Sequence, residues 1–145
     1  MTTRLRPHKT VYERQTLVAA AARTATAGDA GAAARLPIAG AYVFVLDVTE
    51  AATDVGDTLD VFVQALLGST WVDVAHFTQV LGNGGAKRYV AKVCAGVAEA
   101  MFSDASALAA GSVRHVVGDA WRARWVIVDA DADASFTFSV VAVPV

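Results

Sequence analysis

Hydrophobic and polar positions alternate along three consecutive segments of the chain between Ala41 and Gly82. Each segment is rich in β-branched and aromatic residues, which suit the pleated surface of a half-buried strand. The segments cover residues 41–48, 58–65 and 70–80, and turn-forming residues at 53–57 and 68–69 separate them. These connections are too short to hold crossover helices, so neighbouring strands are predicted to run antiparallel.

The same alternation returns in four later segments, which cover residues 87–93, 113–117, 121–128 and 135–143. Trp121 and Trp125 alternate with arginines, so both rings are predicted to point to the inner face of a sheet. In the last segment four apolar residues share one face: Phe136, Phe138, Val140 and Ala142. Seven or eight strands in residues 41–145 predict an all-β fold, an antiparallel β-sandwich or jelly-roll-like domain whose two sheets bury their inner faces.

Residues 96–111 interrupt the strand pattern. Val97, Met101, Ala105 and Leu108 fall at helical spacing, which predicts one short helical insertion at residues 98–110.

The first forty residues are interpreted as an N-terminal arm and edge segment. Residues 16–24 suit either an edge strand or a helical turn, because alanine permits both, and residues 25–34 have the composition of a loop. Residues 35–38 suggest a short strand, which Pro37 confines to an edge or to a strand start. Residues 1–15 are interpreted as an extended arm that becomes ordered only against a partner, the alternative being a terminus with no role.

Composition adds an argument for association with another protein. The chain has 145 residues, of which 55% are apolar, and a mean hydropathy of +0.45, above the 45–50% apolar residues that are usual in globular domains. No apolar run approaches the roughly 20 residues of a membrane helix, and no signal-peptide core follows Met1. We therefore expect no membrane association and a surplus of apolar surface that meets another chain.

Cys94 is the only cysteine, which excludes an intrachain disulfide and fits a small buried hydrophobe.

Charge is divided unevenly along the chain. Residues 1–40 hold six basic and two acidic residues, a balance of +4, whereas residues 41–145 hold six basic and twelve acidic residues, a balance of −6. A basic arm ahead of an acidic body favours association between copies. The arm residues expected to contact a capsid or another subunit are Arg4, Arg6, Lys9, Tyr12 and Arg14. Direct nucleic-acid binding is not expected, because the cations are few and no aromatic residues interleave them.

Six short segments carry a resemblance to a known group of proteins. They are residues 46–49, 58–61, 70–73, 77–80, 122–125 and 135–140. In these segments the chain resembles small β-sandwich structural proteins of tailed bacteriophages, over about half to two-thirds of its length. It departs from the group's pattern in the short turn at residues 67–69 and in the insertion at residues 96–111.

The resemblance implies a non-enzymatic virion component, a decoration (cement) protein on the capsid surface that is assembled in the host cytoplasm. Its partners would be the major capsid protein and copies of itself, by analogy a homotrimer. A neck or tail location is a second interpretation. A third, from a different class, is a carbohydrate-binding or adhesion module that uses the tryptophans.

Candidate chemistry is sparse, and we predict no catalytic, cofactor-binding or metal-binding residues. Asp129, Asp131 and Asp133 could hold Ca²⁺ with carboxylate oxygens, but the pattern fits a solvated acidic hairpin tip better. Asp47 and Asp60 could face each other like a glycosidase pair, although no sugar cleft accompanies them. A sugar-stacking platform could use three tryptophans, Trp71, Trp121 and Trp125, but large aromatics in strands are more often core or interface. No serine lies in a nucleophile elbow, and residues 82–85 are interpreted as a hairpin turn rather than a phosphate loop.

Overall fold

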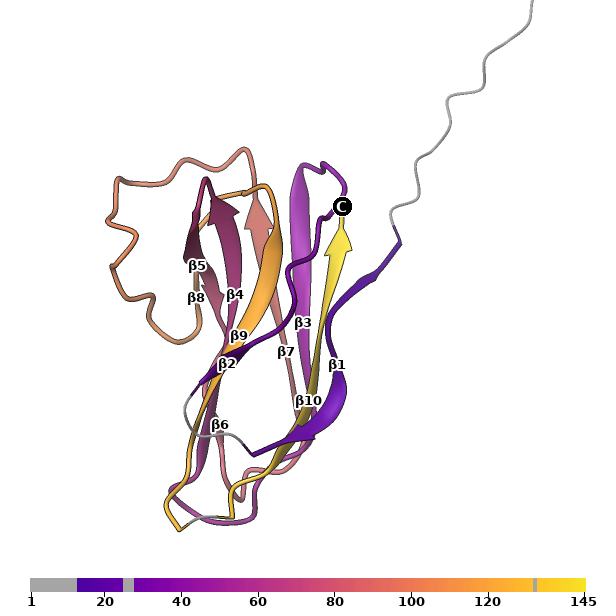
Figure 1. Ribbon diagram of the computed structural model, residues 1–145, viewed down its shortest axis with the longest axis vertical. Coiled ribbons are helices and arrows are strands. Elements are labelled where there is room, and N and C mark those ends of the chain that lie inside the picture. Colours follow the sequence, from indigo (N-terminus) through magenta and orange to yellow (C-terminus); the bar gives the residue numbers. More distant parts are fainter. Residues whose placement is uncertain (1–12, 25–27, 132) are drawn as a thin grey trace, which may run out of the picture.

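The chain folds into two antiparallel sheets packed face to face, a β-sandwich without helices in the part that the structure describes (Figure 1). The structure is a computed structural model, and it describes residues 13–24, 28–131 and 133–145. The four-stranded sheet has the order β1-β10-β3-β7, with strands Gln15–Arg23, Phe136–Pro144, Ala41–Glu50 and Lys87–Cys94. The six-stranded sheet has the order β2-β9-β4-β5-β8, with strands Asp29–Ala30, Trp121–Val128, Thr58–Leu67, Thr70–His76 and Ser112–Val113. The short strand β6, Val80–Leu81, also pairs with β4.

The predicted fold class is confirmed, and so are the faces of the strands. Along β9 and β10 buried residues alternate with half-buried ones, as strand geometry requires. Trp121, which is 1% exposed, lies in the core between the sheets, where its ring contacts those of Tyr42 and Phe44. Phe136, Phe138, Val140 and Ala142 are also buried there.

The sheet pairing differs from a simple succession of hairpins. β3 pairs with β10 and β7, whereas β4 pairs with β9, β5 and β6, so the chain crosses between sheets after Glu50. The alternative in which Asp47 and Asp60 face each other as a pair is excluded, because the two residues belong to different sheets. Residues 82–85 and 129–133 likewise connect the two sheets and are not hairpin tips, since β6 and β7, and also β9 and β10, lie in different sheets.

The turn at Gly68 and Ser69 is a two-residue hairpin between β4 and β5, where Leu67 pairs with Thr70. Gly68 has a positive φ of 65°, a conformation that glycine adopts without a steric penalty and that short hairpins commonly need.

The predicted helix at residues 98–110 is wrong. The segment is an irregular loop beside β5 and β8 (Figure 1). An isolated helix of this length is marginal unless one face is buried, and here Met101 is fully exposed and Val97 is also exposed. The predicted strand at residues 35–38 is absent too, and only Ser112 and Val113 form a strand near the predicted 113–117 segment.

The N-terminal part contributes one long strand. β1 is an edge strand that pairs with β10 and buries Leu17 and Val18 in the core, which decides between the two alternatives for residues 16–24. The predicted arm contacts Arg4, Arg6, Lys9 and Tyr12 lie outside the described residues.

Within the described ranges, the chain forms no helix long and apolar enough to cross a membrane.

Candidate interaction surfaces

The outer face of the four-stranded sheet carries apolar residues where an exposed sheet face usually carries polar ones. The strand register aligns Val90 of β7 with Val45 of β3, and Val45 with Val141 of β10, in one row across the sheet. A neighbouring row holds Val43 and Val143. We call these five residues the valine face.

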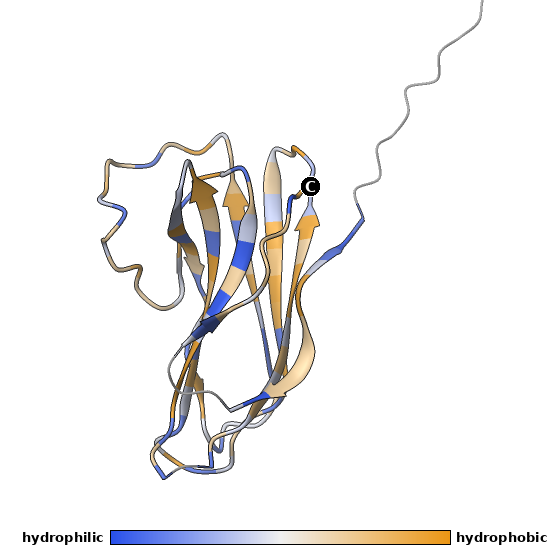
Figure 2. Cartoon of the chain, in the orientation of Figure 1, coloured by the Kyte–Doolittle hydropathy of each residue, from blue (hydrophilic) through white to orange (hydrophobic). Residues whose placement is uncertain are grey.

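The valine face is open to solvent. Val90 is 65% exposed, and the other four valines are half-buried. Hydrophobic residues follow β3 and β10, the central strands of this sheet (Figure 2). Because the inner faces of these strands already form the core, no second layer of the described fold covers the outward valines, which is typical of an interaction surface.

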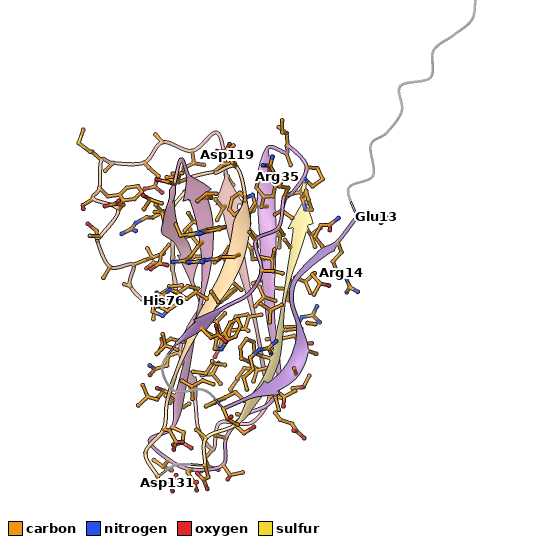
Figure 3. All side chains as sticks on the ribbon, in the orientation of Figure 1. Glu13, Arg14, Arg35, His76, Asp119 and Asp131 are labelled. Carbon is orange, nitrogen blue, oxygen red and sulfur yellow. The ribbon has the colours of Figure 1, made fainter. Side chains whose placement is uncertain are left out.

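A hollow of about 390 Å³ crosses this face between β1 and β3. Val45, Val141 and Val143 line it, and Arg14 and Arg88 contribute cationic side chains. Arg14, the one predicted arm contact that lies among the described residues, is exposed on the outer side of this sheet (Figure 3). The arm thus enters the fold beside the valine face.

The outer face of the six-stranded sheet is organised differently, by arginines stacked on aromatic rings. The guanidinium carbon of Arg122 lies 4.4 Å from the ring centroid of Trp71, and that of Arg124 lies 3.9 Å from the centroid of Phe62. Such cation–π contacts are favourable by about 0.5–2 kcal/mol. Desolvation lowers the pKa of Arg122, and repulsion from Arg124 lowers it further.

Hydrogen bonds connect these arginines across the sheet. Arg122 Nε donates to Gln64 Oε1 at 2.7 Å, and Gln64 Nε2 donates to Asp73 Oδ1 at 2.9 Å. Arg124 Nη2 completes the chain with Asp73 Oδ2 at 3.3 Å. These polar groups find partners within the sheet, so they have less need of an external partner than the residues of the valine face.

The 96–111 loop is fastened to the same sheet. The guanidinium of Arg114 donates to the carbonyl oxygens of Ser106 and Ala107 and stacks on Phe102 at 4.4 Å. His76 Nδ1 lies 2.7 Å from Leu108 O, and His76 Nε2 lies 2.8 Å from Asp60 Oδ1. Both ring nitrogens of His76 are therefore engaged in holding the loop and the sheet together.

The tryptophans do not form a common platform. Trp121 and Trp125 are core residues, whereas Trp71 is half-buried on the outer face and is stacked against Arg122. The three-tryptophan sugar platform considered above is therefore wrong.

The predicted acidic residues separate into two groups. Asp129 accepts hydrogen bonds from the backbone amides of Asp131, Asp133 and Ala134, so it shapes its own loop. Asp131 and Asp133 instead lie with Asp54 and Asp57 of the β3–β4 connection, and a carboxylate oxygen from each of the four lies within 4.8 Å of the others. We call these four residues the acidic cluster.

The close approach of these carboxylates raises the pKa of two of them, Asp54 and Asp133. A hydrogen bond to Asp133, together with repulsion from that group, raises the pKa of Asp54. The pKa of Asp133 is also raised, mainly by its hydrogen bond to Asp131.

The valine face was missed from the sequence, although a signal for it exists. Residues 41–46 and 140–143 are continuous apolar runs, which indicate a strand with both faces apolar rather than one half-buried strand.

Comparison with known proteins gives no assignment: the chain matches no protein-family model and no curated protein sequence.

Proposed function

We propose that the protein is a non-enzymatic structural protein of a tailed-phage virion, a decoration (cement) protein that binds the capsid surface through its four-stranded sheet and its N-terminal arm. The observation that carries this proposal is the valine face, which forms rows across β7, β3 and β10 beside the start of the arm. The sequence resemblance to phage structural proteins is the reason for proposing a phage virion as the place where this surface is used.

The engaged polar groups support a non-enzymatic function. The His76–Asp60 pair resembles part of a catalytic site, but both nitrogens of the ring are held, one of them by the carbonyl of Leu108. Asp73 is likewise bound to Gln64 and Arg124. Such groups serve to fix the loop and the sheet rather than to move protons to a substrate.

The size of the valine face indicates how it would be used. Complete burial of one valine contributes about 1.5–3 kcal/mol, so five partly buried valines contribute on the order of 5 kcal/mol. Association itself costs about 4–15 kcal/mol. One valine face is therefore too weak to hold a subunit alone, and binding requires several linked contacts.

The arm and additional copies would supply those contacts. A homotrimer presents three valine faces and three basic arms to neighbouring capsid subunits, which converts weak contacts into strong overall binding. In this arrangement the protein would bridge the major capsid protein subunits and resist the pressure of the packaged DNA. A neck or tail component would use the same surfaces.

Deleting residues 1–12 should weaken binding to phage heads roughly tenfold while leaving the melting temperature of the free protein nearly unchanged. The deletion ends before β1 begins at Gln15, so the sheet is preserved. The electrostatic part of the contribution should decline with added salt, because exposed charges are screened beyond about 8 Å at physiological ionic strength. The measurement is a binding titration on heads assembled without the protein, at two salt concentrations.

A full-length variant with Arg4, Arg6 and Lys9 replaced by serine separates charge from chain length. It should bind like the deletion variant if the arm acts through its cations. Equal occupancy by the wild type and both variants at both salt concentrations would show that the arm is passive.

A further inference from the structure

The end of the sandwich that carries Asp131 (Figure 3) brings together two connections that are far apart in the sequence. Asp54 and Asp57 come from the β3–β4 connection, whereas Asp131 and Asp133 come from the β9–β10 connection. Both connections run from one sheet to the other.

Asp57 is the unusual member of the acidic cluster. It is 1% exposed, and charged residues are rarely buried without a partner. Its Oδ1 accepts a hydrogen bond from the backbone amide of Ala130 at 2.8 Å. Its Oδ2 is fully buried and has no hydrogen-bond partner among the described residues.

The surrounding backbone holds Asp57 firmly in this position. The carbonyl oxygen of Asp57 accepts from the amide of Gly82 at 2.7 Å, and its amide donates to Asp54 O at 3.4 Å. A Cβ at Gly82 would overlap the carbonyl oxygen of Asp54, so glycine permits the close packing of the β6–β7 connection against the β3–β4 connection. These contacts fix the Asp57 backbone, and the Ala130 amide holds its carboxylate.

We propose that the acidic cluster of Asp54, Asp57, Asp131 and Asp133 is a Ca²⁺ site, in which the cation is the missing partner of Asp57 Oδ2. The donors are all carboxylate oxygens, which suit a hard cation and not zinc. Ca²⁺ takes oxygen ligands at about 2.3–2.6 Å, so opposite ligands stand roughly 4.6–5.2 Å apart. The four oxygens lie within 4.8 Å of one another, so one Ca²⁺ ion could contact all of them. Mg²⁺ keeps several of its waters and is less suited to a site built from protein carboxylates alone.

Binding of Ca²⁺ would link the β3–β4 connection to the β9–β10 connection, each of which runs from one sheet to the other. The bound ion replaces the mutual repulsion of four close carboxylates with attraction to a common centre. Because the ion binds the folded chain and not the unfolded one, it should stabilise the sandwich.

Thermal unfolding of the full chain in EDTA-stripped buffer, with and without 10 mM CaCl₂, tests the proposal. For an affinity of about 10⁻⁴ M, which is usual for extracellular calcium modules, the melting temperature should rise by about 5 °C or more. Parallel samples contain MgCl₂, or NaCl at matched ionic strength, and these should show a smaller rise. No difference between CaCl₂ and matched NaCl would overturn the proposal.

Single substitutions locate the site. Asp131→Asn should lose most of the rise with CaCl₂ without lowering the melting temperature in EDTA, because it removes one of four repelling charges. Asp57→Asn keeps the Oδ1 acceptor and should lose the rise as well; if it does not fold, Asp133→Asn replaces it in the series. Asp104→Asn, an exposed acid in the 96–111 loop, is the control and should keep the full rise. An equal rise in Asp131→Asn and Asp104→Asn would overturn the proposed site.

Discussion

Replacing Trp121 with alanine should lower the free energy of unfolding by about 3–5 kcal/mol. The side chain is almost completely buried between the sheets, with ring centroids 4.8 Å from Tyr42 and 5.3 Å from Phe44. Its removal leaves a cavity that rigid sheets cannot fill. Because small domains have total stabilities of about 5–15 kcal/mol, the variant should lose a large part of its stability in chemical denaturation.

Trp71→Ala is the matched control, because Trp71 is also on a strand of the six-stranded sheet but faces outward. Its loss removes the stacking with Arg122 and should cost less than about 1.5 kcal/mol. Trp125→Ala should behave like Trp121→Ala, since Trp125 is buried against Phe138. A change below about 1 kcal/mol for Trp121→Ala would contradict its assignment to the core.

Val90→Glu should weaken binding to phage heads at least tenfold. Val90 lies on the edge strand β7 in the row with Val45 and Val141. Binding of the valine face to a partner would take the new carboxylate out of water, which is costly, and the exposed Arg88 and Lys92 on the same face of β7 would offset only part of that cost. In the free protein the side chain remains in water, so the fold should keep its melting temperature. Co-sedimentation with heads that lack the protein measures the effect.

Val128→Glu provides the control for this experiment. Val128 is 52% exposed and ends β9 in the other sheet, so the substitution has similar chemistry at a site outside the valine face. It should change head binding less than threefold. Equal loss of binding in Val90→Glu and Val128→Glu would mean that added negative charge, and not the valine face, determines the result.

The strands could be predicted from the sequence because their signal is local. The alternation in residues 121–128 matches β9 in both its ends and its buried face. The pairing of strands is not local, which is why β3 and β4 could not be assigned to different sheets from their own residues. Short turns between strands suit both a hairpin and a crossing between sheets.

The prediction of a helix at residues 98–110 was wrong because helix formation here also depends on contacts with distant residues. Helical spacing of Val97 and Met101 indicates an amphipathic helix only if the fold offers a surface to bury that face. Instead, Arg114 and His76 hold the backbone carbonyls of this loop, and these two residues carry no local signal for such contacts.

The acidic cluster could be predicted only in part, because its members are far apart in the sequence. The sequence indicated Asp131 and Asp133 together with Asp129, because the three alternate in one loop. Asp129 instead binds its own backbone, and Asp54 and Asp57 take part through a connection more than seventy positions earlier. Only the packing of the two loops brings these carboxylates together.

A cryo-EM map of the proposed phage particle tests the central proposal most directly. We predict density for the β-sandwich on the outer surface of the head, repeated with the capsid symmetry, with the valine face against the capsid or a second copy and the N-terminal arm extended over a capsid subunit. Density confined to the neck or tail would contradict the decoration function while keeping a virion role. Particles that lack the protein altogether would contradict both.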